Sequence, residues 1–253
     1  MEHSLNGKVA VVTGGTTGVG AGIAHALAAV GARVVVTDVD QGRIDQATAS
    51  SAGRLLGERA DAGDAAQMDA LLRRVVQAHG SLDVLVLNAV HDAHAPLGRI
   101  TEDQFDTMMR INLRGPLFTI QAAVPLMRPG GAIILIGSTA SVAPPAGMAV
   151  YGAIKAGMRG MMRSLVQDLG GTGIRLNMLS PGPVNTESLR RALVKAAGEK
   201  EAAAIIGSIA GRSPLRRIGE PEEIGRTAVF LSSDMASYVN GTELFADGGL
   251  PAV

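Results

Sequence analysis

The fold is decided by a short stretch near the amino terminus, Val9-Ala10-Val11-Val12-Thr13-Gly14-Gly15-Thr16-Thr17-Gly18-Val19-Gly20. Its apolar, β-branched first half predicts a strand that is buried on both faces, as in a parallel sheet. Its glycine-rich second half opens a helix that we expect to end near Val30. A glycine-rich turn between a strand and a helix is typical of phosphate binding, because free amide groups and the positive end of the helix dipole meet there.

The three glycines at positions 14, 18 and 20 follow the spacing G-x-x-x-G-x-G, whereas the commonest dinucleotide fingerprint is G-x-G-x-x-G. We expect Gly14 to permit the tight turn, Gly18 to let the backbone approach a pyrophosphate, and Gly20 to allow close packing of helix on strand. An ordinary glycine-rich turn is the alternative in a chain with 33 glycines. The strand before the turn and the helix after it favour a dinucleotide, although the spacing alone does not settle the ligand.

Outward from this stretch, short apolar runs alternate with longer helical patterns along all 253 residues, with no linker, charge block or repeat. Strands are expected at Val9–Thr13, Arg33–Thr37, Leu55–Ala60, Val84–Leu87, Ala132–Ile136, Ile174–Leu179 and Glu243–Ala246. The pattern predicts one α/β domain over residues 1–253, with a doubly wound, mostly parallel seven-stranded sheet and helices on both faces. Ligands of such sheets bind beyond the carboxyl ends of the strands.

Composition excludes several classes of protein. The 23 basic and 23 acidic residues cancel, and four Phe and two Tyr offer no stacking platform, so we expect no nucleic-acid partner. The absence of cysteine excludes disulfides and thiolate metal sites and suits a reducing, cytoplasmic location. Residues 129–154 carry no charge, but glycine, serine and proline interrupt them, so we expect a buried strand and a loop rather than a membrane span.

An acidic residue ends the second expected strand. Asp38 lies eighteen residues past Gly20, where a carboxylate can hydrogen-bond the adenosine ribose and repel a 2′-phosphate. No Arg or Lys lies in the glycine turn or between Asp38 and Arg43. The sequence therefore predicts NAD rather than NADP. Asp61, after the third strand, is a candidate adenine contact, with helix capping or solvent exposure as the alternative.

Three polar residues near the middle of the chain are further candidates for a site at the carboxyl edge of the sheet. Tyr151 and Lys155 are four residues apart and therefore share one face of a helix. Ser138 comes just after the expected strand at 132–136, and so also lies at a carboxyl strand end. A phenol has a pKa of about 10, too high for a base at neutral pH, but a neighbouring cation favours the phenolate.

With these residues the chain resembles the short-chain dehydrogenase/reductase family in its compact, single-domain branch. The resemblance covers the whole chain through the residues Thr13–Gly20, Asp38, Asp61, Asn88-Ala89, Asn112, Ser138, Tyr151 with Lys155, Pro181–Thr186 and Asp247-Gly248-Gly249. It implies a Rossmann-type fold and hydride transfer between nicotinamide and a secondary alcohol or ketone. It also implies catalytic roles: Tyr151 as general acid/base, Ser138 as hydrogen-bond donor to the substrate oxygen, Lys155 on the nicotinamide ribose, and Asn112 holding a water that links Lys155 to solvent.

The same resemblance implies a set of cofactor-binding residues along the carboxyl edge of the sheet. They are Gly14, Thr16, Thr17, Gly18, Val19, Gly20, Asp38, Asp61, Ala62, Asn88, Ala89, Tyr151, Lys155, Pro181, Gly182, Val184 and Thr186. Taken singly, most of these residues have an ordinary structural explanation. Their joint order and spacing favour the functional one.

The chain departs from the family pattern after the fourth strand. The family sequence Asn-Asn-Ala-Gly reads Leu87-Asn88-Ala89-Val90 here, which puts a β-branched side chain near the expected ribose and nicotinamide. The next residues are His91-Asp92-Ala93-His94, in which two imidazoles three positions apart and a carboxylate could form part of a metal site. Without a clear fourth ligand we expect no metal, and interpret these as solvated loop residues; a substrate contact from His91 or His94 is the second interpretation.

Expectations about substrate and assembly also come from the resemblance. The loop after Asn88, the stretch 139–150 and a lid at about residues 185–214 line the cleft. Their side chains are mostly apolar, which indicates a mainly apolar small-molecule substrate. The helix after Tyr151 carries Gly157, Gly160 and three methionines, which suit close helix packing between subunits. We expect a homotetramer.

Two other functions stay open. A 3-oxoacyl-carrier-protein reductase has a similar pattern, but it usually prefers NADPH, which Asp38 opposes, and needs a basic docking surface for which Arg128 is thin support. A non-catalytic NAD(H)-binding sensor belongs to a different class. It would be expected to lose Ser138, Tyr151 or Lys155 while keeping the glycines, and this chain keeps all three.

Overall fold

The expected strands form one parallel sheet in the computed structural model, which describes residues 4–250 without the side chains of residues 192 and 195–197. The outermost residues of the expected domain, 1–3 and 251–253, lie outside the described residues. The strand order is β3-β2-β1-β4-β5-β6-β7, and every adjacent pair is parallel. The bounds are β1 Val9–Thr13, β2 Arg33–Asp38, β3 Leu55–Arg59, β4 Leu82–Leu87, β5 Met127–Ile136, β6 Arg175–Pro181 and β7 Glu243–Ala246. The predicted Rossmann-type fold is confirmed.

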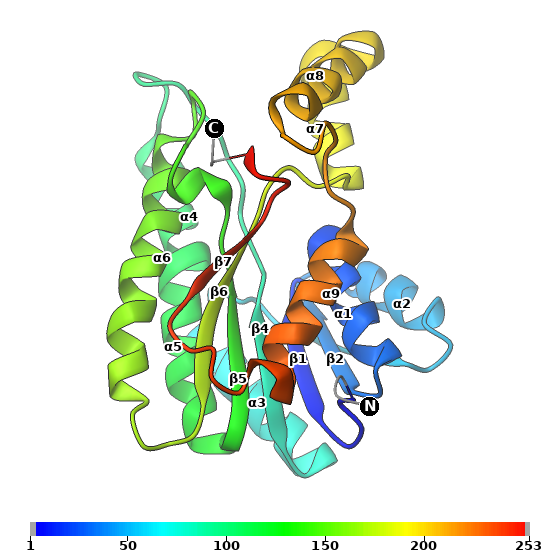
Figure 1. Ribbon diagram of the computed structural model, residues 1–253, viewed down its shortest axis with the longest axis vertical. Helices are drawn as coiled ribbons and strands as arrows, with labels where there is room; N and C mark the ends of the chain where they lie inside the picture. Colours follow the sequence, from blue (N-terminus) through cyan, green and yellow to red (C-terminus); the bar gives the residue numbers. More distant parts are fainter. Residues whose placement is uncertain (1–3, 251–253) are drawn as a thin grey trace.

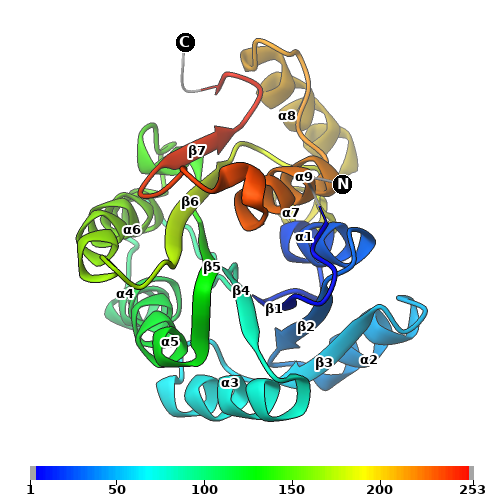
Figure 2. The ribbon, with the colours of Figure 1, turned by 60° about the horizontal axis from the view of Figure 1, so that its bottom comes forward.

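Helices cover both faces of the sheet, so the central strands are buried on both sides (Figure 2). On one face, α1 (Gly18–Ala29) and α9 (Pro221–Ser232) pack against alternate residues of the strands, such as Val12 and Val36. On the other, α3 (Ala65–His79), α5 (Gly115–Ala123) and α6 (Ala149–Asp168) pack against the intervening residues. This two-sided burial is why the strands read as continuous apolar runs rather than as alternating ones.

The segment expected as one helix from about Gln104 to Met127 is interrupted. It begins as α4 (Glu102–Met109), widens into a π-helical turn over Arg110–Arg114, and continues as α5 before a 3₁₀ turn at Val124–Leu126. Met127 is the first residue of β5 rather than the last of the helix. A π-turn inserts one residue into the helical repeat and changes the direction of the side chains on either side, and such turns are frequent at functional sites.

Two helices extend beyond the carboxyl edge of the sheet. Figure 1 shows α7 (Glu187–Ala197) and α8 (Glu199–Arg212) above the ends of β1, β4 and β6, packed mainly on each other. They fall within the segment expected as a lid. The remaining helix, α2 (Gln41–Ala49), lies beside β3 at the edge of the sheet. Among the described residues, no helix has the length and apolar character needed to cross a membrane.

Candidate functional site

The glycine turn joins the end of β1 to the start of α1. Gly14 and Gly18 have φ values of +60° and +55°, which L side chains rarely adopt. A Cβ on Gly20 would lie inside contact distance of the Gly14 carbonyl oxygen and 2.5 Å from Asn88 Nδ2. Gly20 therefore lets the start of α1 lie directly against the backbone of Gly14, at the end of β1, and against the side chain of Asn88. Gly15 makes the close approach to the sheet, at Val36 of β2.

The first turn of α1 is without a side-chain cap. Its N-cap residue, Thr17, makes no capping hydrogen bond, whereas the N-caps Asp40, Asp64, Thr101 and Thr186 of α2, α3, α4 and α7 all accept backbone amides. The amides at the start of α1 are therefore free to bind an anion at the positive end of the helix dipole. Together with the absence of side chains at Gly14 and Gly20, this fits the pyrophosphate of a dinucleotide.

Asn88 holds the glycine turn against the end of β4. Its Nδ2 donates to the carbonyl oxygens of Thr13 and Gly14 at 3.0 and 2.9 Å. Thr13 Oγ1 accepts the amides of Asn88 and Ala89, each at 3.0 Å. The chain turns here without the family glycine, because the backbone of Val90 is not left-handed and its side chain is half exposed.

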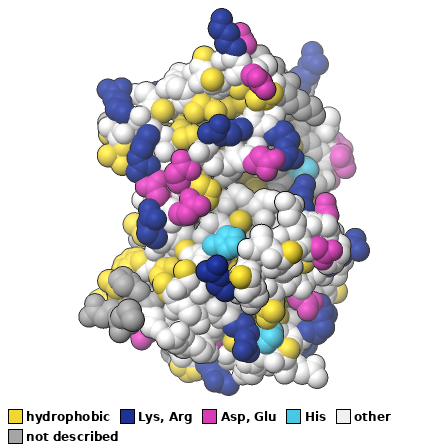
Figure 3. All heavy atoms as spheres, turned by 90° about the vertical axis from the view of Figure 1, so that its right-hand side faces the viewer, with side chains coloured by type: hydrophobic (Ala, Val, Ile, Leu, Met, Phe, Trp, Pro, Cys, Tyr) yellow, Lys and Arg dark blue, Asp and Glu magenta, His cyan; other side chains and the backbone are white. Residues whose placement is uncertain are grey.

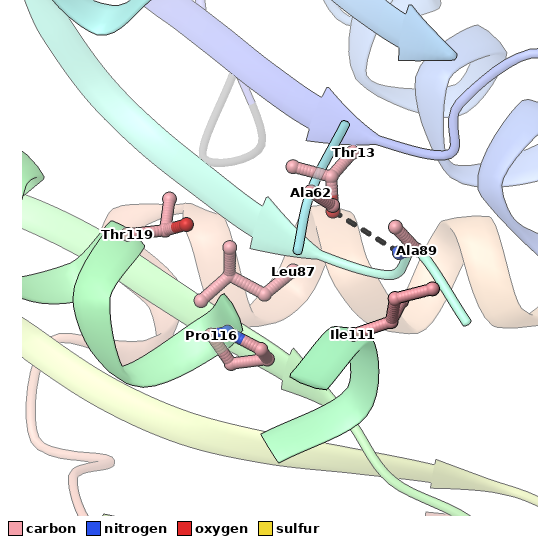
Figure 4. Close-up of a pocket in the computed structure, with 7 residues that line it drawn as sticks. All are labelled: Thr13, Ala62, Leu87, Ala89, Ile111, Pro116 and Thr119. Atoms are coloured by element: carbon pink, nitrogen blue, oxygen red, sulfur yellow. Dashed lines mark hydrogen bonds between the residues drawn. The ribbon is translucent and has the colours of Figure 1, made fainter. Parts of the chain in front are cut away.

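A small crevice opens beside this junction (Figure 4). Its lining comes from four separate segments and consists of Thr13, Ala62, Leu87, Ala89, Ile111, Pro116 and Thr119. Ala62 and Ala89 were predicted as cofactor residues. Thr13 was named as part of the glycine stretch but not as a cofactor residue. Leu87, Ile111, Pro116 and Thr119 were not predicted as site residues, because β4, the π-turn and α5 carry no motif that marks them.

Asp38, at the end of β2, faces the glycine turn. Its carboxylate accepts a hydrogen bond from Thr16 Oγ1 and another, at 3.0 Å, from the amide of Asp40. The register pairs Asp38 with Arg59 of β3, whose Nε donates to the Val39 carbonyl oxygen at 2.9 Å. A cation therefore does lie beside Asp38. Arg59 is twenty-one positions away along the chain, so the sequence neighbourhood of Asp38 did not contain it.

Asp61 follows β3 and is tied to the π-turn. One carboxylate oxygen accepts the Gly63 amide at 2.8 Å, and the other pairs with Arg110 Nη1 at 2.9 Å. The side chain thus both forms a turn and bridges two elements. It lies next to Ala62 in the wall of the crevice, which keeps an adenine contact geometrically open.

Tyr151 and Lys155 lie one helical turn apart near the start of α6, as predicted. The Lys155 ammonium nitrogen is 5.5 Å from the centre of the Tyr151 ring and donates to the carbonyl oxygen of Ile136, the last residue of β5, at 2.7 Å. Ser138 follows two residues later, where its Oγ accepts the Ala140 amide at 3.1 Å. The three side chains therefore meet at the carboxyl end of β5.

Burial dominates the ionisation of this group. It raises the pKa of Tyr151 to about 12, with a further upward contribution from the charge of Asp92, while the Ser138 hydroxyl lowers it. Burial also lowers the pKa of Lys155 to about 8, against an upward contribution from Asp92. The lowering of the Tyr151 pKa that we expected from Lys155 is not produced by the protein's own groups, since desolvation of the phenolate outweighs it.

The raised pKa of Tyr151 can be measured directly. The chain has two tyrosines and no tryptophan, so in Tyr238→Phe the near-ultraviolet absorbance of phenolate reports Tyr151 alone. Because burial penalises the charged form, we expect that variant to titrate near pH 12, and adding Asp92→Asn to lower the midpoint. Circular dichroism at each pH verifies that the fold persists. A midpoint at or below 10.0 would contradict the burial argument.

Asn112 lies in the π-turn with its side chain buried. Its Oδ1 accepts the His91 amide and its Nδ2 donates to the His91 carbonyl oxygen, both at 2.8 Å. The amide group thus holds the loop after β4. The water-holding role that the resemblance implied stays a prediction, and no hydrogen bond joins Asn112 to Lys155.

The loop after β4 brings Asp92 and His94 to Tyr151. The Nε2 atom of His94 lies 2.5 Å from Asp92 Oδ1, and the His94 and Tyr151 rings meet edge to face with centroids 6.0 Å apart. The hydrogen bond to Asp92 raises the pKa of His94. No three His, Asp or Glu side chains within residues 4–250 converge as metal ligands would.

The segment Pro181–Thr186 returns the chain to the glycine turn. Thr186, the N-cap of α7, is the side chain that a Cβ on Gly18 would contact at 3.3 Å. Val184 is buried in the core formed with α1 and α9, and Gly182 packs against Asp247 at the end of β7. All predicted residues of this segment therefore lie along the same edge as the glycine turn.

A buried carboxylate on β7 ties the Ser138 turn to α6. Glu243 Oε1 accepts hydrogen bonds from Ser141 and Ser180 at 2.8 and 2.7 Å, and its Oε2 pairs with Arg159 at 3.2 Å. Arg159 lies one turn after Lys155 on α6, and Ser141 ends the short helical turn that follows Ser138. This network was missed because its members are spread over more than a hundred positions.

We expect Glu243→Gln to lower the free energy of unfolding by about 2 kcal/mol, because it leaves Arg159 without its counter-charge in a largely buried site. Thermal or denaturant unfolding measures the loss. Asp69→Asn is the matched control, since it breaks the exposed Asp69–Arg73 pair and is expected to change the free energy of unfolding much less. Equal effects of the two substitutions would show that the Glu243 network does not stabilise this region.

Comparison with known proteins agrees with this geometry. A family model described as enoyl-(acyl carrier protein) reductase matches residues 14–251. An oxidoreductase of Sarocladium schorii, asL5, is 40% identical over 98% of this chain and 98% of its own. The chain belongs to the short-chain dehydrogenase/reductase family. It is accordingly an oxidoreductase of that type, and members of the family typically bind NAD or NADP and act on small molecules.

Two further proteins are similar to this short-chain dehydrogenase/reductase: one is a named reductase and the other is a solved structure. The 3-oxoacyl-[acyl-carrier-protein] reductase FabG of Thermotoga maritima is 33% identical, over 97% of this chain and 98% of its own. The structure of a mutant short-chain dehydrogenase/reductase of Serratia marcescens superimposes with a TM-score of 0.89 and 33% identity, covering 98% of this chain and 100% of the other.

Proposed function

We propose that the protein is an NAD-dependent dehydrogenase that interconverts a secondary alcohol and its ketone. The observation that carries the proposal is the meeting of Tyr151, Lys155 and Ser138 at the end of β5, on the same edge of the sheet as the uncapped glycine turn. The nicotinamide would supply the hydride acceptor or donor when bound. The protein's part is to hold the substrate oxygen and to move its proton.

In this proposal the Tyr151 hydroxyl exchanges a proton with the substrate oxygen. In alcohol oxidation the substrate carbon would give a hydride to the nicotinamide, and the substrate oxygen would pass its proton to the phenolate form of Tyr151, which leaves a carbonyl. Ser138 Oγ donates a hydrogen bond to that oxygen and steadies the charge that develops on it. Lys155, fixed to the Ile136 carbonyl oxygen, places a positive charge beside the ring where the phenolate forms.

The remaining site residues would hold the dinucleotide. The glycine turn with Thr16, Thr17 and Val19 would bind the pyrophosphate, Asp38 the adenosine ribose, and Asp61 with Ala62 the adenine. Asn88, Ala89 and the segment Pro181–Thr186 would surround the nicotinamide half. We choose NAD because the Asp38 carboxylate would repel the 2′-phosphate of NADP. The nearby cation of Arg59 would act in the opposite direction, by attracting that phosphate.

The proposal also includes one domain, a cytoplasmic location and a homotetramer. Residues 185–214 would form a lid, in keeping with the way α7 and α8 extend above the sheet in Figure 1. Figure 3 shows hydrophobic side chains gathered on the upper part of one face, over these two helices, with charges of both signs interspersed. The proposal of a mainly apolar substrate rests on the apolar residues of segments 139–150 and 185–214 in the sequence.

The test is NADH formation from NAD with secondary alcohols, polyols, sterols and 3-hydroxyacyl thioesters. We expect one class to turn over. If none does while calorimetry shows that NADH binds, the dehydrogenase proposal fails and the non-catalytic sensor takes its place.

A 3-oxoacyl-carrier-protein reductase is the second candidate, favoured by the similarity to the Thermotoga maritima enzyme. Arg128, the residue considered for docking the acidic carrier, lies near the start of β5 and donates to the Gly80 carbonyl oxygen at 2.8 Å. That is the amino edge of the sheet, opposite the site. Turnover restricted to 3-hydroxyacyl thioesters would select this candidate.

A further inference from the structure

Asp92 and His94 lie at the site but have no part in the proton transfer described above. The loop that carries them is fixed at every second residue. Asn112 holds both backbone groups of His91, Gln104 of α4 donates to the Ala93 carbonyl oxygen at 2.9 Å, and the Ala95 amide donates to the Gly147 carbonyl oxygen at 3.1 Å. The two side chains between these anchors are therefore held in place beside Tyr151.

The contact between Asp92 and His94 leaves one ring nitrogen of the histidine unused. Asp92 occupies His94 Nε2, which fixes the orientation of the imidazole and leaves Nδ1 on the opposite edge of the ring. Among residues 4–250, Nδ1 makes no hydrogen bond. The imidazole is 38% exposed and contacts Tyr151 edge to face. The ring that carries this nitrogen packs against the ring of Tyr151, so Nδ1 is available to a molecule bound beside it.

An apolar substrate would gain nothing from this arrangement and would bear a cost. The charge of Asp92 raises the pKa of Tyr151 and so opposes the phenolate that alcohol oxidation needs. The other ionisable groups at this position are His94 on the same loop and Lys155 on α6. The carboxylate is useful where it holds an imidazole that binds the substrate.

We propose that the Asp92–His94 pair binds a second oxygen of the substrate, so that the enzyme selects 1,2-diols and α-hydroxy ketones over alcohols and ketones with a single oxygen. The inference rests on the proposed function, because it places the reacting oxygen at Tyr151 and the neighbouring oxygen at His94 Nδ1. The rest of the substrate would still face the apolar surfaces of the cleft.

The experiment compares matched substrates that differ by one hydroxyl: 2,3-butanediol against 2-butanol, and 1,2-cyclohexanediol against cyclohexanol. We expect kcat/KM to favour each diol by about tenfold to a hundredfold, as for a hydrogen bond to a charged or polar group in a binding site. His94→Leu should abolish this ratio, mainly by raising KM for the diol, and leave the single alcohols within about threefold. His94→Gln, which keeps a polar group, should restore part of it.

The neighbouring His91→Gln is the control, because its side chain is exposed and its backbone alone is held by Asn112. A merely structural role for His94 would lower turnover of diols and single alcohols alike, and that result would overturn the inference. So would equal preference in the unmodified enzyme. If both kinds of alcohol turn over without discrimination, the dehydrogenase proposal stands and only this inference fails.

Binding gives a readout that does not need turnover. Calorimetry of acetoin and 2-butanone added to the protein with NADH should show tighter binding of acetoin, by about tenfold or more, and His94→Leu should remove the difference. Equal affinities would overturn the inference even if no alcohol is oxidised. Absence of turnover would separately count against the dehydrogenase proposal.

Discussion

Replacing Tyr151 by Phe is expected to reduce kcat by about 10³-fold, within the range that a positioned general acid/base contributes. The substitution removes one hydroxyl and keeps the ring, whose centre lies 6.0 Å from the centre of the His94 ring and 5.5 Å from Lys155 Nζ. The fold and the dinucleotide turn should therefore persist, and dinucleotide affinity should change by less than about tenfold. Steady-state kinetics on the best alcohol, with calorimetry of NADH binding, measures both quantities.

Tyr238→Phe is the matched control, since it makes the same chemical change at the only other tyrosine, whose side chain is fully exposed. We expect its kcat to stay within about twofold of the unmodified enzyme. If Tyr151→Phe keeps more than about a tenth of the activity, a different group moves the proton, and the role assigned to Tyr151 is wrong.

Changing Asp38 is expected to have the second largest effect, on the choice of dinucleotide. In Asp38→Ala with Val39→Arg, the carboxylate that repels a 2′-phosphate is removed and a cation is added at an exposed position beside Arg59. Each change is worth about 1.5–3 kcal/mol at a charged hydrogen-bonded site. The ratio of kcat/KM for NAD to that for NADP should fall by about 10³-fold in the double variant, and by about 10- to 100-fold in Asp38→Ala alone.

Asp45→Ala serves as the control for a lost negative charge, because Asp45 lies on α2 and its carboxylate accepts a hydrogen bond from Gln41 of the same helix. Its NAD to NADP ratio should not change. An unmodified enzyme that already prefers NADPH strongly would show that the cation of Arg59 outweighs Asp38. In that case the cofactor assignment, though not the dehydrogenase chemistry, would have to be reversed.

The sequence predicted the strands well because each strand's burial is recorded in its own residues. All seven expected runs are strands, with ends displaced by a few residues. The helix expected from Gln104 to Met127 shows the limit of such local reasoning. Nothing in its periodicity marks the π-turn at Arg110–Arg114, which accommodates Asn112 in the interior and its contact with His91.

For single residues too, the sequence predicted what depends on neighbouring positions and missed what depends on tertiary contacts. The glycines of the turn were found from spacing, but the additional contact of Gly20 with Asn88, which reaches across from β4, was not. The phenol and ammonium of Tyr151 and Lys155 were placed together correctly, since four residues make one turn of helix. The spacing did not reveal that burial raises the pKa of Tyr151, because burial is a property of the surroundings rather than of the neighbouring residue. The lower pKa expected from Lys155 together with a positive nicotinamide ring stays a prediction.

The sequence by itself therefore determined the order of strands and helices, the glycine turn, and the group formed by Ser138, Tyr151 and Lys155. Each depends on residues within one element or on the rule that parallel strands end at one edge. Only the tertiary structure decided that Arg59 lies beside Asp38, that Glu243 joins β7 to α6, and that His94 meets Tyr151. These contacts join residues far apart in the chain, and their distances are set by strand register and helix packing, which no local pattern encodes.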